Sequence, residues 1–234
     1  MRRLLYLTQT KGFRHGCLEL SHKIIRELAP KSGFEVTITE NAADVNRANL
    51  DGYDAVMFYT TGELAMTDDD KKALLEFVRK GKGFIGIHSA TDTYYQWPEY
   101  GELLGGWFDG HPWSQEVNII VEDTKHPTTA HLGKAFRLLE EVYQYRNWSR
   151  AKTHVLLSLD NESVDVSKGK REDKDNAMAW CHAYGKGRVF FTGLGHYDEC
   201  WNDERFHKHL VNGIRWAMGD LPGAAPLGTP RPRK

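Results

Sequence analysis

The chain has 234 residues, of which 40% are hydrophobic, and its 31 basic residues nearly balance its 32 acidic ones, for a formal net charge of -1. That length accommodates one large domain with a substantial core. The balanced charge provides no overall field for nucleic acid or an anionic membrane surface, so we expect neither as a partner.

No apolar run is as long as a membrane span, and the run at residues 4–7 is too short for a signal-peptide core, so a cytoplasmic protein is expected. Cys17, Cys181 and Cys200 are odd in number and widely spaced. This spacing is typical of reduced thiols and argues against a disulfide framework or a C-x-x-C zinc site.

In the first half of the chain, apolar runs of strand length alternate with segments of helical period, the pattern of repeated βαβ units with a parallel sheet. The four-residue spacing of apolar side chains over residues 20–28 predicts a helix that Pro30 and Gly33 end. A second helix begins at Thr67, which has an acid three residues later as in a capping box, and stops at Gly81. The predicted strands are residues 3–8, 36–38, 54–59 and 83–87.

The second half is less regular, and some of its strands are expected to be antiparallel additions. They are predicted over residues 117–121, 155–159, 177–180 and 189–192. A final helix follows over residues 203–217 with Gly219 as its cap, residues 161–175 form an exposed loop, and the Pro- and Gly-rich tail over residues 221–234 is expected to be disordered. The prediction is therefore one α/β domain over residues 1–220, with a flavodoxin-like, doubly wound and mainly parallel sheet.

Ligands of such sheets bind outside the carboxyl ends of the strands, where the strand order reverses. Three polar turns follow predicted strands: residues 12–15 after the first, residues 60–63 after the third and residues 88–92 after the fourth. We expect these turns to meet at one edge of the sheet and to form the site there.

His88 has the most informative position of the candidate site residues. The sequence Gly-Ile-His-Ser-Ala at residues 86–90 runs from a buried strand into a turn, as a nucleophile elbow does. Histidine is a good acid, base or metal ligand near neutral pH and an uncommon covalent nucleophile. Since Ser89 is adjacent in sequence and points elsewhere in an elbow, a Ser-His hydrolase is not indicated.

Further motifs resemble parts of a folded site. They are Gly-Gly-Trp-Phe-Asp-Gly-His-Pro at residues 105–112, Glu-Glu-Val-Tyr-Gln-Tyr at residues 140–145 and Gly-Leu-Gly-His at residues 193–196. The chain resembles the ThuA-like, or trehalose-utilisation, family over nearly its whole length before the tail. The resemblance rests on Gly-Phe-Arg-His at residues 12–15, Gly-Ile-His-Ser at residues 86–89, the motif at residues 105–112 and Gly-Lys-Gly-Arg-Val-Phe-Phe-Thr-Gly-Leu-Gly-His at residues 185–196.

The resemblance implies a class I glutamine amidotransferase-like fold and a role in sugar catabolism, in particular the breakdown of glycosides oxidised to 3-keto sugars. It implies no glutaminase activity, because this elbow carries His88 where that class needs Cys. The residues expected to act in catalysis are His15, His88, His111, Glu141 and His196. Those expected to bind substrate are Arg14, Thr60, Gly62, Ser89, Asp92, Trp107, Phe108 and Tyr143.

The leading functional hypothesis is an enzyme that cleaves or converts a glycoside or 3-keto sugar by histidine acid/base chemistry. A variant adds a divalent metal such as zinc, held by His15, His88 and His111 with Asp92 or Asp109. The alternative is a non-catalytic sugar-binding or regulatory module. In each case the expected partner is a small carbohydrate, no cofactor is required by the sequence, and a homo-oligomer is compatible with it.

The remaining histidines and cysteines carry weaker expectations. His22, His207 and His209 lie off the apolar stripes of their helices and are expected on the solvated surface, whereas His126, His131, His154 and His182 have no special context. Cys17 opens the first predicted helix, whose N-terminus would lower its thiol pKa.

Overall fold

The sheet of this protein joins a parallel half to an antiparallel half. The computed structural model describes residues 1–231 and contains a nine-stranded sheet of order β2-β1-β3-β4-β11-β10-β9-β6-β7. The parallel half consists of β2 (Phe34–Thr39), β1 (Arg2–Leu7), β3 (Ala55–Phe58), β4 (Gly83–Ile87) and β11 (Gly187–Thr192). The antiparallel half consists of β10 (Ala177–Tyr184), β9 (His154–Leu159), β6 (Trp113–Val121) and β7 (Ala135–Val142).

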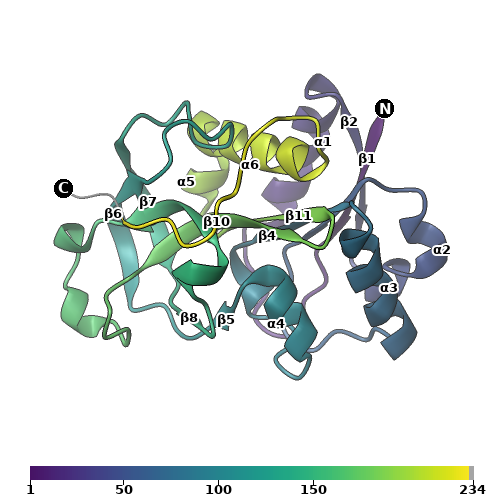
Figure 1. The fold of residues 1–234 in the computed structure, drawn as a ribbon, viewed down its shortest axis with the longest axis horizontal. Helices are drawn as coiled ribbons and strands as arrows, with labels where there is room; N and C mark the ends of the chain where they lie inside the picture. Colours follow the sequence, from purple (N-terminus) through teal and green to yellow (C-terminus); the bar gives the residue numbers. More distant parts are fainter. Residues whose placement is uncertain (232–234) are drawn as a thin grey trace.

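Helices cover both faces of the sheet. In Figure 1, α1 (Leu18–Lys31) and α6 (Glu204–Ala217) lie on one side, and α3 (Asp68–Arg79) and α4 (Pro98–Leu104) lie on the other. The alternation within β1 explains the two layers: Leu4 and Tyr6 join the core under α1, whereas Leu5 and Leu7 join the core under α3. The predicted doubly wound, mainly parallel α/β fold with antiparallel additions is confirmed.

The helix boundaries follow from local chemistry. Thr67 Oγ1 accepts a hydrogen bond from the Asp70 N–H at 3.1 Å, so the predicted cap of α3 is present. Pro30 lies inside the last turn of α1 and does not end it; the chain leaves the helix at Ser32 and Gly33, whose φ of 86° is left-handed. Gly219 adopts the same left-handed region directly after α6.

Several shorter elements complete the fold. The helices α2 (Arg47–Leu50) and α5 (Asp198–Trp201) and the two-stranded pair β5 (Trp107–Phe108) with β8 (Tyr145–Arg146) were not apparent from the sequence pattern. Within residues 161–175, predicted as an exposed loop, lie two 3-10 turns at Asn161–Ser163 and Val166–Lys168. None of the helices in the described chain is long and apolar enough to span a membrane.

The tail lies along the body of the protein through residue 231. Trp216 Nε1 donates to the Gly223 carbonyl at 3.1 Å, and Arg150 Nη1 donates to the Thr229 carbonyl at 3.3 Å. These contacts belong to a segment whose composition predicts disorder; the last residues of that segment, 232–234, lie outside the described part of the chain.

Two histidines expected on the surface are buried, so that prediction is wrong for both. His22 Nε2 lies 2.9 Å from Thr8 Oγ1, and His209 Nδ1 lies 2.9 Å from the Thr128 carbonyl oxygen. Because each ring has a polar partner, it can be buried without losing its hydrogen bonds. His207, also expected to be solvated, is half-buried.

Candidate active site

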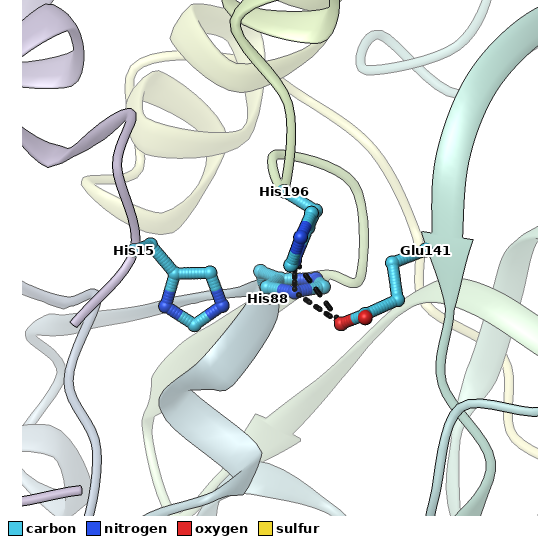
Figure 2. A group of neighbouring side chains, drawn as sticks. All are labelled: His15, His88, Glu141 and His196. Carbon is cyan, nitrogen blue, oxygen red and sulfur yellow. Dashed lines mark hydrogen bonds and ion pairs between the residues drawn. The ribbon is translucent and has the colours of Figure 1, made fainter. Parts of the chain in front are cut away.

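Four ionisable side chains from separate parts of the chain converge at one edge of the sheet. His15 lies in the loop after β1, His88 directly follows β4, Glu141 belongs to β7, and His196 lies in the loop after β11. Figure 2 shows the three imidazole rings and the carboxylate facing one another. One ligand atom from each residue lies within 4.8 Å of all the others. We call this group the four-residue cluster.

His88 occupies a strained elbow. Its φ of 42° is left-handed, which is uncommon for a residue other than glycine, and it comes where the buried strand β4 passes into a short 3-10 turn. Its Nδ1 lies 2.8 Å from the Gly193 carbonyl oxygen, which only accepts hydrogen bonds. Nδ1 therefore donates, and the neutral ring keeps the lone pair of Nε2 for the cluster.

That lone pair faces two other members of the cluster. His88 Nε2 lies 3.1 Å from His196 Nδ1 and 3.6 Å from Glu141 Oε2 (Figure 2). His196 Nδ1 lies 3.1 Å from the same Glu141 oxygen. Burial alone would raise the pKa of Glu141, but the neighbouring His196 and His88 imidazoles outweigh it and hold that pKa well below its usual range.

His15 completes the cluster without a hydrogen bond of its own. Its side chain is 4% exposed, and neither ring nitrogen has a partner among the described residues. Its ring centroid lies 5.0 Å from those of both His88 and His196. Burial, together with the proximity of the titratable His88 and His196 rings, lowers the pKa of His15 to about 3, so the ring is neutral at pH 7.

The donor set suits a divalent transition metal. Imidazole nitrogens with one carboxylate oxygen are typical ligands of zinc and similar ions, and the unpartnered nitrogens of buried His15 would gain a partner from such an ion. The His88 ring is held as metal-binding histidines usually are, with its other nitrogen donating to a carbonyl. The geometry thus groups His196 and Glu141 with His15 and His88, and leaves His111, a predicted ligand, outside the set.

A cavity of about 370 Å³ opens beside the cluster, within the size range of small-molecule sites. Its walls include the rings of Phe108 and Tyr143, whose centroids lie 4.4 Å apart, and the exposed ring of Phe13. The other lining residues are His15, Asp92, His111, Glu141 and His196. A pocket with aromatic walls and convergent polar groups can hold a sugar-sized ligand.

His111 lies at the open side of this cavity. Its side chain is half exposed, and its Nδ1 lies 3.3 Å from Glu141 Oε1, the carboxylate oxygen that does not face His196. His111 is therefore the member of the site best placed to exchange protons with solvent.

Asp92 is half-buried in the cavity wall, accepts a hydrogen bond from the Tyr95 hydroxyl, and has a pKa raised by burial.

Not every predicted binding residue lines the cavity. Arg14 is exposed and pairs with Glu19 and Glu40 on the surface. Four other predicted binding residues also lie outside the lining of the cavity. Thr60 bonds to the Thr93 hydroxyl, Gly62 pairs with Thr93 in a backbone bridge, Ser89 is fully buried, and Trp107 packs its ring against Gly101.

Cys17 is not an activated thiol, so the expectation of a lowered pKa is wrong. Its Sγ lies 3.1 Å from the Tyr59 hydroxyl and 3.3 Å from the Gly195 carbonyl oxygen. Burial raises the pKa of the thiol to about 11, which outweighs any effect of the helix end. None of the three cysteines could act as the nucleophile of a glutaminase without rearrangement, since all are buried.

Glu140 adjoins the cluster through the backbone but was not among the residues predicted for the site. Its side chain is fully buried below the cluster, and its carboxylate accepts three backbone hydrogen bonds. The signal was present: Phe136, Leu138 and Val142 occupy the buried face of β7 at alternate positions, and Glu140 occupies the same series. Acidic residues are rarely fully buried unless their oxygens are paired, so an acid among the buried apolar positions of a strand indicates a specific role.

Comparisons with known proteins agree with this architecture. A model of the ThuA family, described as trehalose utilisation, matches residues 3–217. The chain is similar to a ThuA-like protein from Bacteroides uniformis at 24% identity, with a TM-score of 0.77 over 92% of this chain and 91% of that chain. A ThuA-like protein from Parabacteroides merdae follows at 19% identity and a TM-score of 0.73, over 96% of this chain and 93% of that chain.

The likeness extends to a chain of the PurLQS structure from Thermotoga maritima, at 15% identity and a TM-score of 0.55, over 92% of this chain and 99% of that chain. This agrees with the predicted glutamine amidotransferase-like fold. Among curated proteins, no match was found.

Proposed function

Since this chain belongs to the ThuA family of trehalose utilisation, we propose that it is an enzyme of carbohydrate catabolism that cleaves or converts a glycoside or a 3-keto sugar. One observation carries the proposal. Three histidines and Glu141 converge on the side of a sugar-sized cavity with aromatic walls. Buried groups of this kind are costly to bring together and cluster at functional sites.

The proton chemistry is assigned to His111 with Glu141. His111 Nδ1 lies 3.3 Å from Glu141 Oε1, and with its proton on that nitrogen the ring would keep a lone pair on Nε2. This is the arrangement of a general base whose tautomer is fixed by a carboxylate. The half-exposed position of the ring lets it return its proton to water.

The reaction follows from the acidity of a keto sugar. A carbonyl at C3 acidifies the proton on C2, and a base such as His111 Nε2 removes it. The electron pair left on C2 forms a double bond to C1 as the C1–oxygen bond breaks, and the departing oxygen takes up a proton from water. Addition of water across that double bond then gives the products of hydrolysis. No covalent bond to the protein is needed, in keeping with a histidine at the elbow.

A divalent metal ion, held by His15, His88, His196 and Glu141, is part of the proposal. When bound, it would polarise the sugar carbonyl as a Lewis acid. The chain supplies the rest of the site: Gly193 fixes the His88 ring, and the rings of Phe108 and Tyr143 offer apolar surfaces to the sugar.

The test combines metal analysis with turnover of 3-keto-trehalose. We expect the purified protein to carry a stoichiometric divalent metal, to lose it on chelation, and to lose turnover with it. His88→Ala should lack both properties, whereas His131→Gln, which changes a histidine remote from the cavity, should retain both. Full turnover by His88→Ala would refute the assignment of this site.

The alternative is a non-catalytic sugar-binding module, favoured by the aromatic walls of the cavity, which a binding protein would need as well. It predicts saturable binding of trehalose or its 3-keto form with no turnover under any pH or metal loading. Glutaminase activity stays disfavoured, because the elbow holds His88 and the thiol of Cys17 is buried with a raised pKa.

A further inference from the structure

The four-residue cluster unites strands that are not neighbours in the sheet. Glu141 belongs to β7 at one edge, and His196 follows β11, with β10, β9 and β6 between them. In the described chain, no ladder hydrogen bond therefore joins the end of β7 to the loop that carries His196. The distance between these two side chains must be fixed by another contact.

Glu140 makes that contact through the backbone. Its Oε1 accepts hydrogen bonds from the N–H groups of Glu141 and His196, both at 3.0 Å, and its Oε2 accepts one from the Gly195 N–H at 2.8 Å. Two of the three donors belong to members of the cluster, one from each element. A single side chain thus connects β7 with the loop after β11.

Stability alone does not account for this residue. A fully buried carboxyl costs free energy even when its oxygens are bonded, and an apolar side chain of similar size often packs as well or better. The preceding and following positions on the same face of β7 are Leu138 and Val142, so an apolar residue at 140 would extend their series. The acid instead provides acceptors directed at the two segments of the site.

We propose that Glu140 is a positioning residue that sets the spacing between the Glu141 carboxylate and the His196 imidazole, and thereby the metal affinity of the four-residue cluster. It contacts no substrate and acts only through these two residues. The consequence for metal binding rests on the proposed function, whereas the spacing itself does not.

The first test is a Co²⁺ titration of Glu140→Gln, which keeps the size of the side chain but turns an amide NH2 toward a backbone N–H. We expect Co²⁺ affinity to fall about 10- to 100-fold, as for other residues that orient metal ligands, and the visible absorption bands of bound Co²⁺ to shift. Glu122→Gln is the matched control. The Glu122 side chain is also largely buried, at 3% exposure, but pairs with Arg150, away from the cluster, so its loss should lower thermal stability and leave Co²⁺ affinity unchanged.

The second test reads the spacing without metal or substrate. In protein labelled with ¹⁵N-histidine, the ring signals of His196 and His88 should move in Glu140→Gln and stay in place in Glu122→Gln. Glu140→Asp, which keeps the carboxylate on a shorter stem, should give smaller shifts.

The two proposals fail in different ways. Wild-type protein that binds no Co²⁺, while the ring signals still move in Glu140→Gln, would remove the metal from the proposed function and leave the positioning role intact. Unmoved His196 and His88 signals, or an equal loss of Co²⁺ affinity in both glutamine variants, would overturn the positioning role.

Discussion

The two oxygens of Glu141 serve different histidines: Oε1 lies 3.3 Å from His111 Nδ1, and Oε2 lies 3.1 Å from His196 Nδ1. One carboxylate therefore orients a half-exposed ring on one side and completes a buried cluster on the other. The two roles can be separated by substitution, because His111 lies outside the cluster and His15 lies inside it.

Replacing His111 by Asn should reduce kcat on 3-keto-trehalose by roughly 100- to 10,000-fold, the usual contribution of a general base. The metal content of His111→Asn should equal that of the wild type, since no member of the cluster is changed. His15→Asn should lose both metal and turnover. Metal analysis and steady-state kinetics on the same samples decide this, and equal metal loss in both variants would contradict the division of roles.

Cys17 should be inert in the native protein. Its thiol is buried and has a pKa of about 11, so little thiolate exists near neutral pH. Iodoacetamide should leave native protein unmodified by mass spectrometry and alkylate all three cysteines after unfolding. Cys17→Ala should keep its turnover. Rapid alkylation of Cys17 in the native protein, with loss of activity, would contradict this prediction and favour thiol chemistry.

Arg150 should be among the most costly polar residues to remove. Its guanidinium donates to Glu122 at 2.6 Å and to Asp175 at 2.7 Å, and the side chains of all three are largely buried. Arg150→Met leaves the Glu122 carboxylate without its cation and leaves Asp175 with only the longer pair to Arg231 at 3.7 Å, so the free energy of unfolding in urea should fall by about 3–5 kcal/mol. Arg14→Met, which breaks exposed pairs, should cost at most about 1 kcal/mol. Similar losses in the two variants would contradict the expectation.

Stability should fall as the pH drops from about 6.5 to 4. Burial lowers the pKa values of His126 and His209 to about 4, whereas both titrate near 6.5 in an unfolded chain. Within this window the unfolded state binds protons that the folded state does not, so protonation favours unfolding. The contribution of the two neutral rings to stability is therefore fully present above the unfolded pKa and is lost as the pH falls to the folded pKa. Urea unfolding at pH values from 7 to 4 should show the decline.

His209→Gln removes one of these groups and serves as the control. The variant should be less stable at pH 7, because the glutamine replaces a well-packed ring, but its free energy of unfolding should depend less on pH between 6.5 and 4. A slope identical to that of the wild type would mean that His209 does not titrate in this way.

The parallel half of the fold could be predicted from sequence because its signals are local. Strand β3 is buried along its whole length, as the continuous apolar run within residues 54–59 predicts, and α3 begins at the Thr67 cap. Strand β7 was missed because Arg137, Glu140 and Glu141 interrupt its apolar character. Glu140 and Glu141 are the two of these residues whose carboxylates contact the His196 segment, a contact that exists only in the folded chain.

The site was predictable to the extent that strand ends reveal it. His15, His88 and His196 each follow a strand of the parallel half, so the rule for open α/β sheets brings them together. The exact partners were not predictable, since they depend on which strand lies at the far edge of the sheet. Arg14 illustrates the limit: it adjoins His15 in sequence, yet its side chain turns outward to Glu19 and Glu40.

The left-handed backbone of His88 has a consequence for the evolution of the fold. For a residue other than glycine such a conformation costs about 1–2 kcal/mol, so the elbow lowers the stability of the folded protein. Drift towards greater stability would therefore favour glycine or asparagine at this position and erase the imidazole. Persistence of histidine at the elbow in any lineage would mark selection for its chemistry against the thermodynamic optimum of the scaffold.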